Sequence, residues 1–285
     1  MNPVNIIKIE NSGINLENTF ESGQCFRWIK ISSNEYEGVC GGKAVHLYSE
    51  KNNKLYINLL SQKFTDEDEI FFKNYFDVNA KYKEVLKKIC LKNDILKKAM
   101  HFAPNIRILR QDPWETLCSF IISQNNNIIR IKNIIERFCF FFGKRITDHY
   151  YAFPTYQSIS TKNVKDLEVI RSGFRARYII DAAQKIASGE VNLEAIRDTP
   201  TDLARAELMK IKGVGKKVAD CTLLYGYDRL EVVPKDVWIN RAIKVLFPGI
   251  EDLTEIFGEY AGVAQLYIFN YVRKNPWTLK VANNN

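Results

Sequence analysis

The sequence predicts an α+β protein, in which a small antiparallel β-sheet is followed by a larger helical region. Over residues 4–60, short β-branched or aromatic runs alternate with turn signals such as Gly41-Gly42, a spacing typical of hairpins. From about residue 66 onward, apolar residues instead recur every three or four positions. We therefore predict an N-terminal antiparallel sheet with helices over residues 1–105 and an all-helical domain over residues 106–285.

The expected elements follow from these patterns. Strands are predicted near residues 25–29, 36–39, 45–48 and 55–60, and later helices near 127–142, 163–171, 175–187, 200–210, 216–226, 236–246 and 258–273. Asp112 and Pro113 predict a helix start, and Thr199 is expected to cap another helix. The aromatic run 138–142 is interpreted as the buried end of a core helix.

Composition and charge limit the class of protein. The chain is 46% hydrophobic and 26% charged, as in ordinary globular domains. Its 41 basic and 33 acidic residues give a net charge of +8, which suits a polyanionic partner but does not establish one. No apolar run approaches the length of a membrane span, and the N-terminus lacks the pattern of a secretory signal.

The cysteines and histidines predict neither a metal site nor a cofactor. The six cysteines contain no Cys-x-x-Cys pair, and the three histidines are far apart. No cysteine follows Cys221, which excludes a cluster of closely spaced C-terminal cysteines that would hold iron and sulfur. We expect a reduced intracellular protein, cytoplasmic and of bacterial type, associated with the nucleoid through DNA.

A glycine hairpin between two predicted helices suggests a phosphate site. Gly213 and Gly215 flank one apolar residue, and Lys216 and Val218 open the helix that follows. Such glycines permit positive φ and the close approach of a ligand, and the N–H groups at a helix start attract anions. This helix–hairpin–helix would bind DNA backbone without reading sequence. A plain glycine turn is the alternative, and non-catalytic DNA-binding proteins use the same hairpin.

Lys217 and Asp236 form a candidate nucleophile and carboxylate. Lys217 lies in the first turn of the helix after the hairpin, where the helix dipole disfavours an ammonium and leaves more neutral amine. Asp236 follows a rigid proline and precedes another helix, so it can cap that helix and face the same site. The alternative is that Asp236 is only a cap and Lys217 only a surface base.

Four ordered motifs resemble the bifunctional 8-oxoguanine DNA glycosylases of the helix–hairpin–helix superfamily, and the match covers roughly residues 20–270. The stretch 213–236 combines the hairpin, a lysine directly before Val-Ala-Asp-Cys, and a Pro-x-Asp element. The asparagine-rich segment 111–131, the N-terminal segment 22–28 and the C-terminal segment 260–265 agree with the same family.

The resemblance implies the catalytic roles. Lys217 would attack C1′ of the damaged nucleotide, expel the base and form a Schiff base that permits β-elimination. Asp236 would stabilise positive charge on the sugar and help to move protons. Lys216 is better interpreted as a phosphate contact.

The resemblance also implies the residues that receive the flipped base. Phe269 and Cys221 would lie on its two faces and Gln265 on its pairing edge. The Gly23 carbonyl would accept a hydrogen bond from N7–H, which 8-oxoguanine has and guanine lacks. Without the resemblance, Gly23 would be interpreted as a turn or bulge glycine.

The gap in the duplex would be filled by Asn125 and by Phe174 as a wedge, with Arg130 and Arg175 contacting the orphaned cytosine. Phe174 stands where eukaryotic relatives carry tyrosine, which puts strict cytosine selectivity in doubt, and Trp238 stands where they carry histidine. The expected partner is double-stranded DNA containing 8-oxoguanine, bound by a monomer. The alternatives are a glycosylase of the same superfamily for another damaged base, and a non-catalytic helix–hairpin–helix protein.

Overall fold

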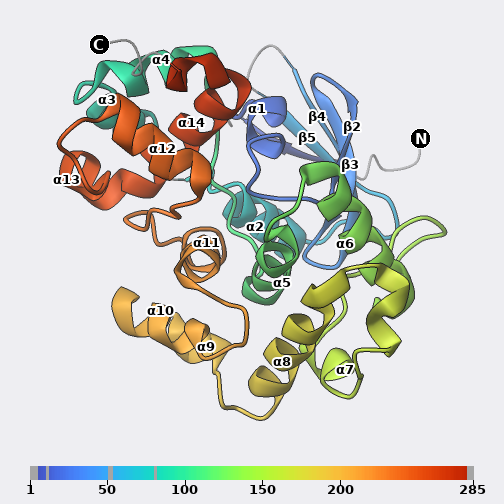
Figure 1. The fold of residues 1–285 in the computed structure, drawn as a ribbon. Helices are drawn as coiled ribbons and strands as arrows, with labels where there is room; N and C mark the ends of the chain where they lie inside the picture. Colours follow the sequence, from blue (N-terminus) through green and yellow to red (C-terminus); the bar gives the residue numbers. More distant parts are fainter. Residues whose placement is uncertain (1–5, 11–12, 51–53, 80–81, 281–285) are drawn as a thin grey trace.

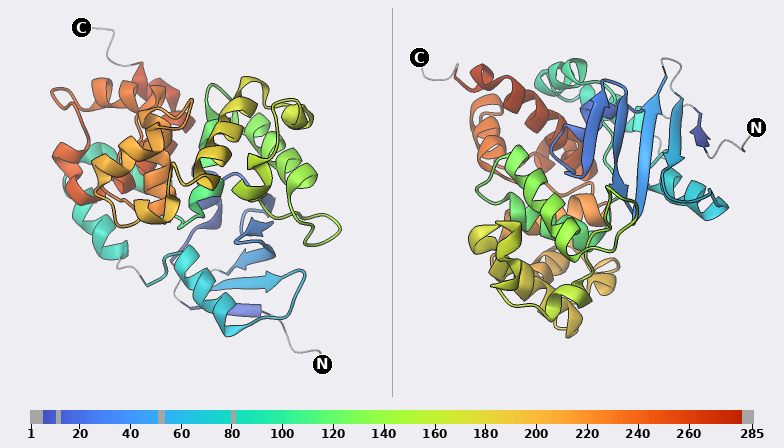
Figure 2. Two further views of the ribbon diagram at one scale, coloured as in Figure 1. Left: turned by 90° about the horizontal axis from the view of Figure 1, so that it is seen from below. Right: turned by 90° about the vertical axis from the view of Figure 1, so that its right-hand side faces the viewer.

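The computed structural model describes residues 6–10, 13–50, 54–79 and 82–280 of the 285-residue chain. In these ranges the chain forms a five-stranded antiparallel sheet and a larger body of helices (Figure 1). The right-hand view of Figure 2 shows the sheet on one side of the helices. The predicted fold class, α+β with the sheet first, is confirmed.

The sheet has the strand order β1-β5-β4-β3-β2, and every neighbouring pair is antiparallel. The strands are β1 (Ile6–Ile9), β2 (Trp28–Ser32), β3 (Glu35–Cys40), β4 (Lys43–Ser49) and β5 (Leu55–Leu59). Alternate side chains such as Trp28, Tyr36 and Leu47 are buried with α1 (Leu16–Phe20) and α2 (Asp66–Tyr75), so the sheet has its own apolar core.

The strand expected at residues 25–29 begins only at Trp28. The preceding segment is tied to the chain that leads into the helices. The Gln24 side chain donates to the Arg107 carbonyl at 2.8 Å and accepts from the Leu109 N–H at 2.9 Å. These bonds replace strand pairing and hold the neighbouring Gly23 against the helical region.

The remaining helices pack around a second apolar core. They are α3 (Tyr82–Cys90), α4 (Asp94–Phe102), α5 (Pro113–Ser123), α6 (Ile128–Phe142), α7 (Tyr156–Ser160), η1 (Asp166–Ile170), η2 (Gly173–Arg175), α8 (Ala176–Ala187), α9 (Leu193–Ile196), α10 (Thr201–Met209), α11 (Lys216–Tyr227), α12 (Val237–Leu246), α13 (Thr254–Phe257), η3 (Gly258–Tyr260), α14 (Ala261–Lys274) and η4 (Pro276–Leu279). Among the described residues, no helix is long and apolar enough to cross a membrane.

The helices form two lobes, seen side by side in the left-hand view of Figure 2. In one lobe α5, α6, α7 and α8 pack together, and in the other α4 and α12 pack on α14. The central helix α11 packs along α5. Because α3 and α4 pack with the helical core, tertiary contacts cross the predicted boundary at residues 105/106, which remains a prediction.

Two predicted helices differ from their expected form. The helix expected at 163–171 is the short 3₁₀ helix η1, which ends at Arg171 in the left-handed conformation. The helix expected from residue 200 begins at Thr201 without a side-chain cap. Thr199, the expected cap, instead donates its hydroxyl to the Ala195 carbonyl at 2.7 Å, which continues the turn after α9.

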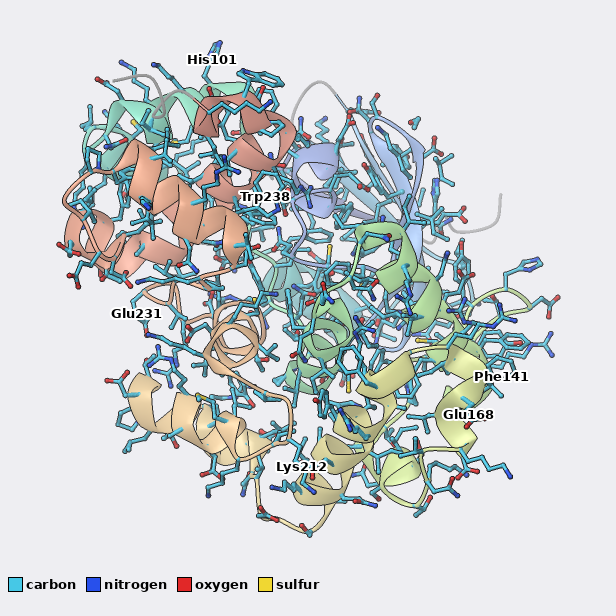
Figure 3. All side chains as sticks on the ribbon, in the orientation of Figure 1. His101, Phe141, Glu168, Lys212, Glu231 and Trp238 are labelled. Carbon is cyan, nitrogen blue, oxygen red and sulfur yellow. The ribbon has the colours of Figure 1, made fainter. Side chains whose placement is uncertain are left out.

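The aromatic end of α6 is only half buried. Phe138 and Cys139 lie in the core as expected, but Phe140 and Phe141 are 55% and 50% exposed. Figure 3 shows Phe141 at the periphery of the molecule. A run of five consecutive apolar residues covers every face of a helix, so it cannot be buried by a core on one side alone.

Candidate active site

Lys217 lies in the first turn of α11, and residues of α5 position its amine. Its Nζ donates to the Ser123 hydroxyl at 3.3 Å and lies 4.9 Å from the centre of the Phe120 ring. Ser123 donates its own proton to the Phe120 carbonyl at 2.8 Å, so its lone pairs are available to the lysine. Neither α5 residue was predicted from the sequence, although both directly precede the asparagine-rich loop.

The two adjacent lysines are placed differently. Lys217 is partly buried against α5, whereas Lys216 is exposed. The charge of Lys216 acts on the buried Asp220, whose pKa burial raises and the Arg205 and Lys216 charges lower. This difference in burial agrees with a nucleophile at position 217 and a phosphate contact at position 216, both of which remain proposals.

Asp236 is the N-cap of α12, and its Oδ1 accepts from the Ile239 N–H at 2.9 Å. The charge of the same carboxylate acts on the Cys221 thiol and on the Arg273 guanidinium. Burial raises the pKa of the Cys221 thiol to about 11, the Lys217 charge opposes this, and the Asp236 charge adds to it. The charges of Lys217 and Asp236 therefore both act on Cys221, and the assignment of these three residues to one active site stays a prediction.

Gly23, Phe269 and Arg273 meet at the N-terminal segment. Gly23 has φ +92°, and a Cβ there would lie 3.1 Å from the Phe269 ring and 3.2 Å from Arg273 Nη1. Arg273 stacks on Phe269 at 5.2 Å from the ring centre and donates to the Glu21 carbonyl at 2.7 Å. Arg273 was not predicted, although it lies one turn after Phe269 on the same face of α14.

Gln265 is 4% exposed, one turn before Phe269 on α14. Its side-chain oxygen has no hydrogen-bond partner in the described part of the chain. A buried polar atom left without a partner carries a desolvation cost, which a ligand can remove. The geometry therefore suits recognition of a polar base edge.

The hairpin uses its two glycines differently. Gly213 has φ +76°, and a Cβ there would lie 2.4 Å from the Tyr178 ring, so both conformation and space require glycine. Gly215 has φ −94°, not the expected positive value, and a Cβ there would meet open space. It begins α11 without a side-chain cap, which leaves first-turn N–H groups, including that of Val218, available to an anion.

The asparagine loop is held by Arg175. Asn125 is exposed in the left-handed conformation, with φ +46°. Arg175 is 2% exposed, and its guanidinium donates to the carbonyls of Gln124 (3.0 Å from Nε), Asn125 (3.0 Å) and Ser172 (3.1 Å). In this structure Arg175 fixes the loop, so contact with a cytosine would require it to release these carbonyls.

Phe174 and Arg130 lie beside this loop. The Phe174 ring is 47% exposed and stacks on the Arg175 guanidinium at 4.4 Å, which leaves it free to act as a wedge. Arg130 is exposed in the first turn of α6. Trp238 is partly buried in the first turn of α12, two residues after Asp236 (Figure 3).

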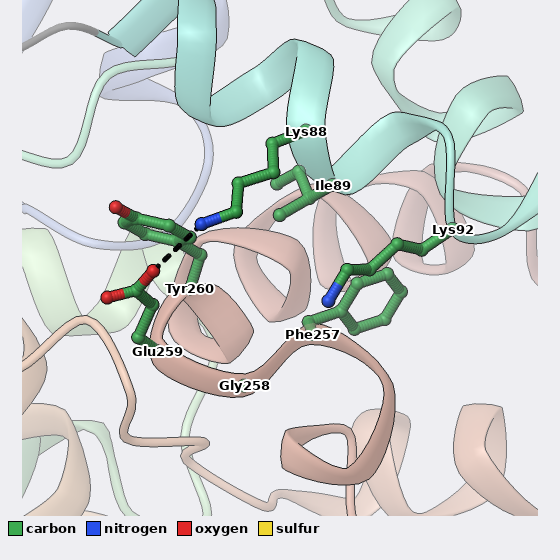
Figure 4. A pocket seen from close by; sticks show the side chains of 7 residues that line it. All are labelled: Lys88, Ile89, Lys92, Phe257, Gly258, Glu259 and Tyr260. Carbon is green, nitrogen blue, oxygen red and sulfur yellow. Dashed lines mark hydrogen bonds and ion pairs between the residues drawn. The ribbon is translucent and has the colours of Figure 1, made fainter.

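A separate cavity of about 250 Å³ lies between the end of α3 and the segment formed by the end of α13 and η3 (Figure 4). Lys88 pairs with Glu259 across it at 3.0 Å, and Lys92 donates to the Ile256 carbonyl at 2.9 Å. None of the predicted site residues lines this cavity. No group of three or more possible metal ligands was found in the part of the chain that the structure describes.

Comparison with known proteins identifies the class. Residues 118–256 match the model described as "HhH-GPD superfamily base excision DNA repair protein", where HhH denotes the helix–hairpin–helix. Residues 6–117 match the model described as "8-oxoguanine DNA glycosylase, N-terminal domain". The fold is therefore that of a helix–hairpin–helix base excision repair protein.

Individual relatives define the family more closely. The structure of MBOgg1 in complex with a low-affinity DNA ligand is 38% identical, with a TM-score of 0.90 over 97% of this chain and 98% of that one. A Clostridium acetobutylicum 8-oxoguanine glycosylase/lyase bound to DNA is 34% identical, with a TM-score of 0.85 over 95% and 98%. The N-glycosylase/DNA lyase of Saccharomyces cerevisiae is 32% identical over 84% of this chain and 69% of its own length. The chain belongs to the 8-oxoguanine DNA glycosylase family.

Proposed function

We infer that the protein is a bifunctional DNA glycosylase and AP lyase, which excises 8-oxoguanine from duplex DNA and then cleaves the strand. The single observation that carries this inference is the position of Lys217, whose amine is held by Ser123 and Phe120 next to Cys221 and Asp236. A lysine in this position provides a nucleophile that a non-catalytic hairpin protein does not need.

In the proposed reaction, the neutral Lys217 amine attacks C1′ of the flipped nucleotide. A bond forms between Nζ and C1′ while the bond from C1′ to N9 breaks, and the departing base takes up a proton. Opening of the sugar ring gives a Schiff base, loss of a proton from C2′ follows, and the 3′ phosphate leaves by β-elimination. Asp236 stabilises the positive charge that develops on the sugar.

The base would be received between Cys221 and Phe269, with the Gln265 amide at its pairing edge and the Gly23 carbonyl at N7–H. The contact of Gly23 with Phe269 and the orphaned oxygen of Gln265 support this proposal. Discrimination follows because unmodified guanine presents a lone pair at N7, which would oppose the buried carbonyl.

The hairpin and the asparagine loop would bind the two sides of the lesion site. Gly213, Gly215, Lys216 and Val218 would hold a phosphate, while Asn125 and Phe174 would fill the gap. Arg130 and Arg175 would contact the orphaned cytosine. We expect the protein to act as a monomer on DNA in the cytoplasm.

The test is a combined excision and trapping assay. Purified protein is incubated with a duplex that carries 8-oxoguanine opposite cytosine, with and without sodium borohydride. We expect base release, strand cleavage and a covalent adduct, and none of these with a matched duplex that carries guanine. Base release without an adduct would indicate a monofunctional glycosylase, and binding without release would indicate a DNA-binding protein alone.

A further inference from the structure

A basic groove lies at the start of α6, beside the asparagine loop. Of the residues that line it, only Arg130 has a role in the proposed function. It has a volume of about 580 Å³ and we name it the α6 groove. Its lining residues are Asn127, Ile129, Arg130, Asn133, Arg137 and Arg171. Three of these side chains are arginines and none is acidic. An open groove with this composition attracts an anion.

The arginines of the groove repel one another. Burial lowers the pKa of Arg137, and the neighbouring Arg171 and Arg130 charges lower it further, against the opposing charge of Glu136. Glu136 is exposed on α6 but does not line the groove. Arg130 and Arg171 are exposed, and within the described residues neither forms an ion pair. A bound polyanion would relieve this repulsion.

The backbone of Arg171 gives an independent indication. Arg171 ends η1 with φ 57° and ψ 34°, the left-handed conformation. This conformation costs a residue with a Cβ roughly 1–2 kcal/mol, and glycine or asparagine adopts it more easily. Strained positions of this kind cluster at functional sites. Arginine at this position places a third guanidinium in the groove.

The α6 groove adjoins the elements expected to face the orphaned base. Asn127 caps α6 directly after the asparagine loop, and Arg130 lies one turn further on. On the other wall, Arg171 is three residues before the exposed Phe174. A DNA strand whose unpaired base met Asn125 and Phe174 would therefore carry its neighbouring phosphates past the groove.

We propose that the α6 groove binds backbone phosphates of the DNA strand opposite the lesion, through Arg171 together with Arg137, while Arg130 keeps its proposed contact with the orphaned cytosine. The inference rests on the proposed function, because it assigns the groove to the complementary strand of the same duplex. These contacts carry no sequence information, but they orient the duplex so that the lesion faces Lys217.

The first test measures how salt weakens binding. Arg171→Asn removes the charge while keeping a residue that tolerates the left-handed backbone, and Arg171→Lys keeps the charge. Lys98→Gln, an exposed position on α4 in the other lobe, is the matched control for charge. Dissociation constants are measured by fluorescence anisotropy with a duplex that contains a tetrahydrofuran abasic analogue opposite cytosine.

We expect the slope of log K against log salt to become shallower by about 0.9 in Arg171→Asn, as for the loss of one phosphate contact. Between 50 and 200 mM salt, the wild-type protein should then lose about 3- to 4-fold more affinity than the variant. Arg171→Lys and Lys98→Gln should keep the wild-type slope. An unchanged slope in Arg171→Asn, with an unchanged melting temperature, would overturn the proposal.

The second test identifies the strand. Single uncharged methylphosphonates replace phosphates one at a time in each strand. We expect a methylphosphonate at one position of the strand opposite the lesion to weaken binding by the wild-type protein. The same substitution should not weaken binding by Arg171→Asn, because that variant has already lost the contact, and this difference shows that Arg171 and the phosphate are coupled. Such coupling on the lesion-containing strand, or on neither strand, would overturn the assignment. These failures differ from a failure of the proposed function, which would appear as absent excision and trapping in the wild-type protein.

Discussion

The lysine side of the site and the asparagine-loop side are fixed by different kinds of interaction. On the lysine side, Gly213, Lys217 and Asp236 owe their positions mainly to a glycine turn, a helix start and a helix cap within residues 213–236. On the other side, Asn125 is held by Arg175, which lies 50 residues away in the sequence. Local signals therefore set the backbone of the lysine side, although the Lys217 amine contacts Ser123 and Phe120 of α5, whereas a tertiary contact holds the backbone of the asparagine loop.

This difference explains why the two sides respond differently to substitution. On the lysine side, Lys217 and Asp236 can be replaced without moving the backbone, because the helices that they begin or cap hold it; Gly213, where a Cβ would meet the Tyr178 ring, is the exception. Arg175, which holds the asparagine loop, cannot be replaced in this way, because the backbone carbonyls to which it donates would lose their hydrogen-bond partner.

Lys217→Gln should reduce excision of 8-oxoguanine by roughly 10⁴-fold or more, because the variant has no nucleophile. Single-turnover kinetics measure the loss. Lys216→Gln is the matched control, since it removes an adjacent charge that is exposed. It should lower the affinity for DNA more than it lowers the single-turnover rate of excision. Comparable loss of excision in both variants would argue against assignment of the nucleophile to position 217.

Asp236→Asn should reduce excision by about 10²- to 10³-fold, because the charge that stabilises the cationic sugar is removed. Asparagine is as good a helix cap as aspartate, so the melting temperature should stay close to that of the wild type. A variant with normal turnover would show that Asp236 serves only to cap α12.

Gly23→Ala should lower kcat/KM for 8-oxoguanine by about 10- to 100-fold. The backbone at φ +92° disfavours a Cβ, and the added methyl group would press on Phe269 at 3.1 Å. Steady-state kinetics and melting curves together measure the effect. Kinetics equal to those of the wild type would contradict the proposed hydrogen bond between the Gly23 carbonyl and N7–H.

Arg175→Lys should lower the free energy of unfolding by about 1–3 kcal/mol, since a compact ammonium cannot reach in several directions as the planar guanidinium does, whose Nε, Nη1 and Nη2 each donate to a different carbonyl. Hydrogen exchange should increase over residues 124–127 in the absence of DNA. Arg177→Lys, an exposed arginine on α8, is the matched control and should show neither change. Unaltered exchange in Arg175→Lys would contradict the role of Arg175 in holding the loop.

A further prediction concerns Glu115 on α5, a partly buried carboxyl group that belongs to neither the lysine side nor the asparagine-loop side. Burial raises its pKa to about 7, and Arg27, at 3.6 Å, acts in the opposite direction. The folded protein therefore keeps a proton on Glu115 that the unfolded chain releases near pH 4.3. The contribution of this group to the free energy of unfolding is most favourable below that pH and is lost as the pH rises towards 7.

Glu115→Gln removes this titration. The difference between the two free energies of unfolding, variant minus wild type, should therefore increase by about 1–3 kcal/mol as the pH rises from 4.5 to 7. Urea denaturation at several pH values measures the difference. Parallel pH profiles for the two proteins would show that the carboxyl group is not desolvated in the fold.

The sequence predicted the elements whose signals are local. The sheet, the hairpin and the caps at Asp112 and Asp236 all follow from short patterns, and the structure contains each of them. It did not predict Ser123 or Arg273, because each acquires its place through a partner far along the chain.

Two further differences have the same origin. The sequence predicts contact of Arg175 with the orphaned cytosine, which stays a prediction, but it did not predict that Arg175 is buried against the asparagine loop, because the Gln124 and Asn125 carbonyls that it bonds come from another segment. The strand β2 begins at Trp28 and not at residue 25 as predicted, because the Gln24 side chain is hydrogen-bonded to the backbone of Arg107 and Leu109 and the segment does not pair with a neighbouring strand. In each case the deciding partner lies outside the window that a local pattern can describe.

The most direct measurement of the central claim is a mass-spectrometric map of the covalent adduct. The wild-type protein is trapped by borohydride on a duplex with 8-oxoguanine, digested, and the cross-linked peptide is sequenced. We expect a reduced sugar remnant on the Nζ of Lys217 and on no other residue. A remnant on Lys216 or elsewhere, or the absence of any adduct while the base is released, would contradict it.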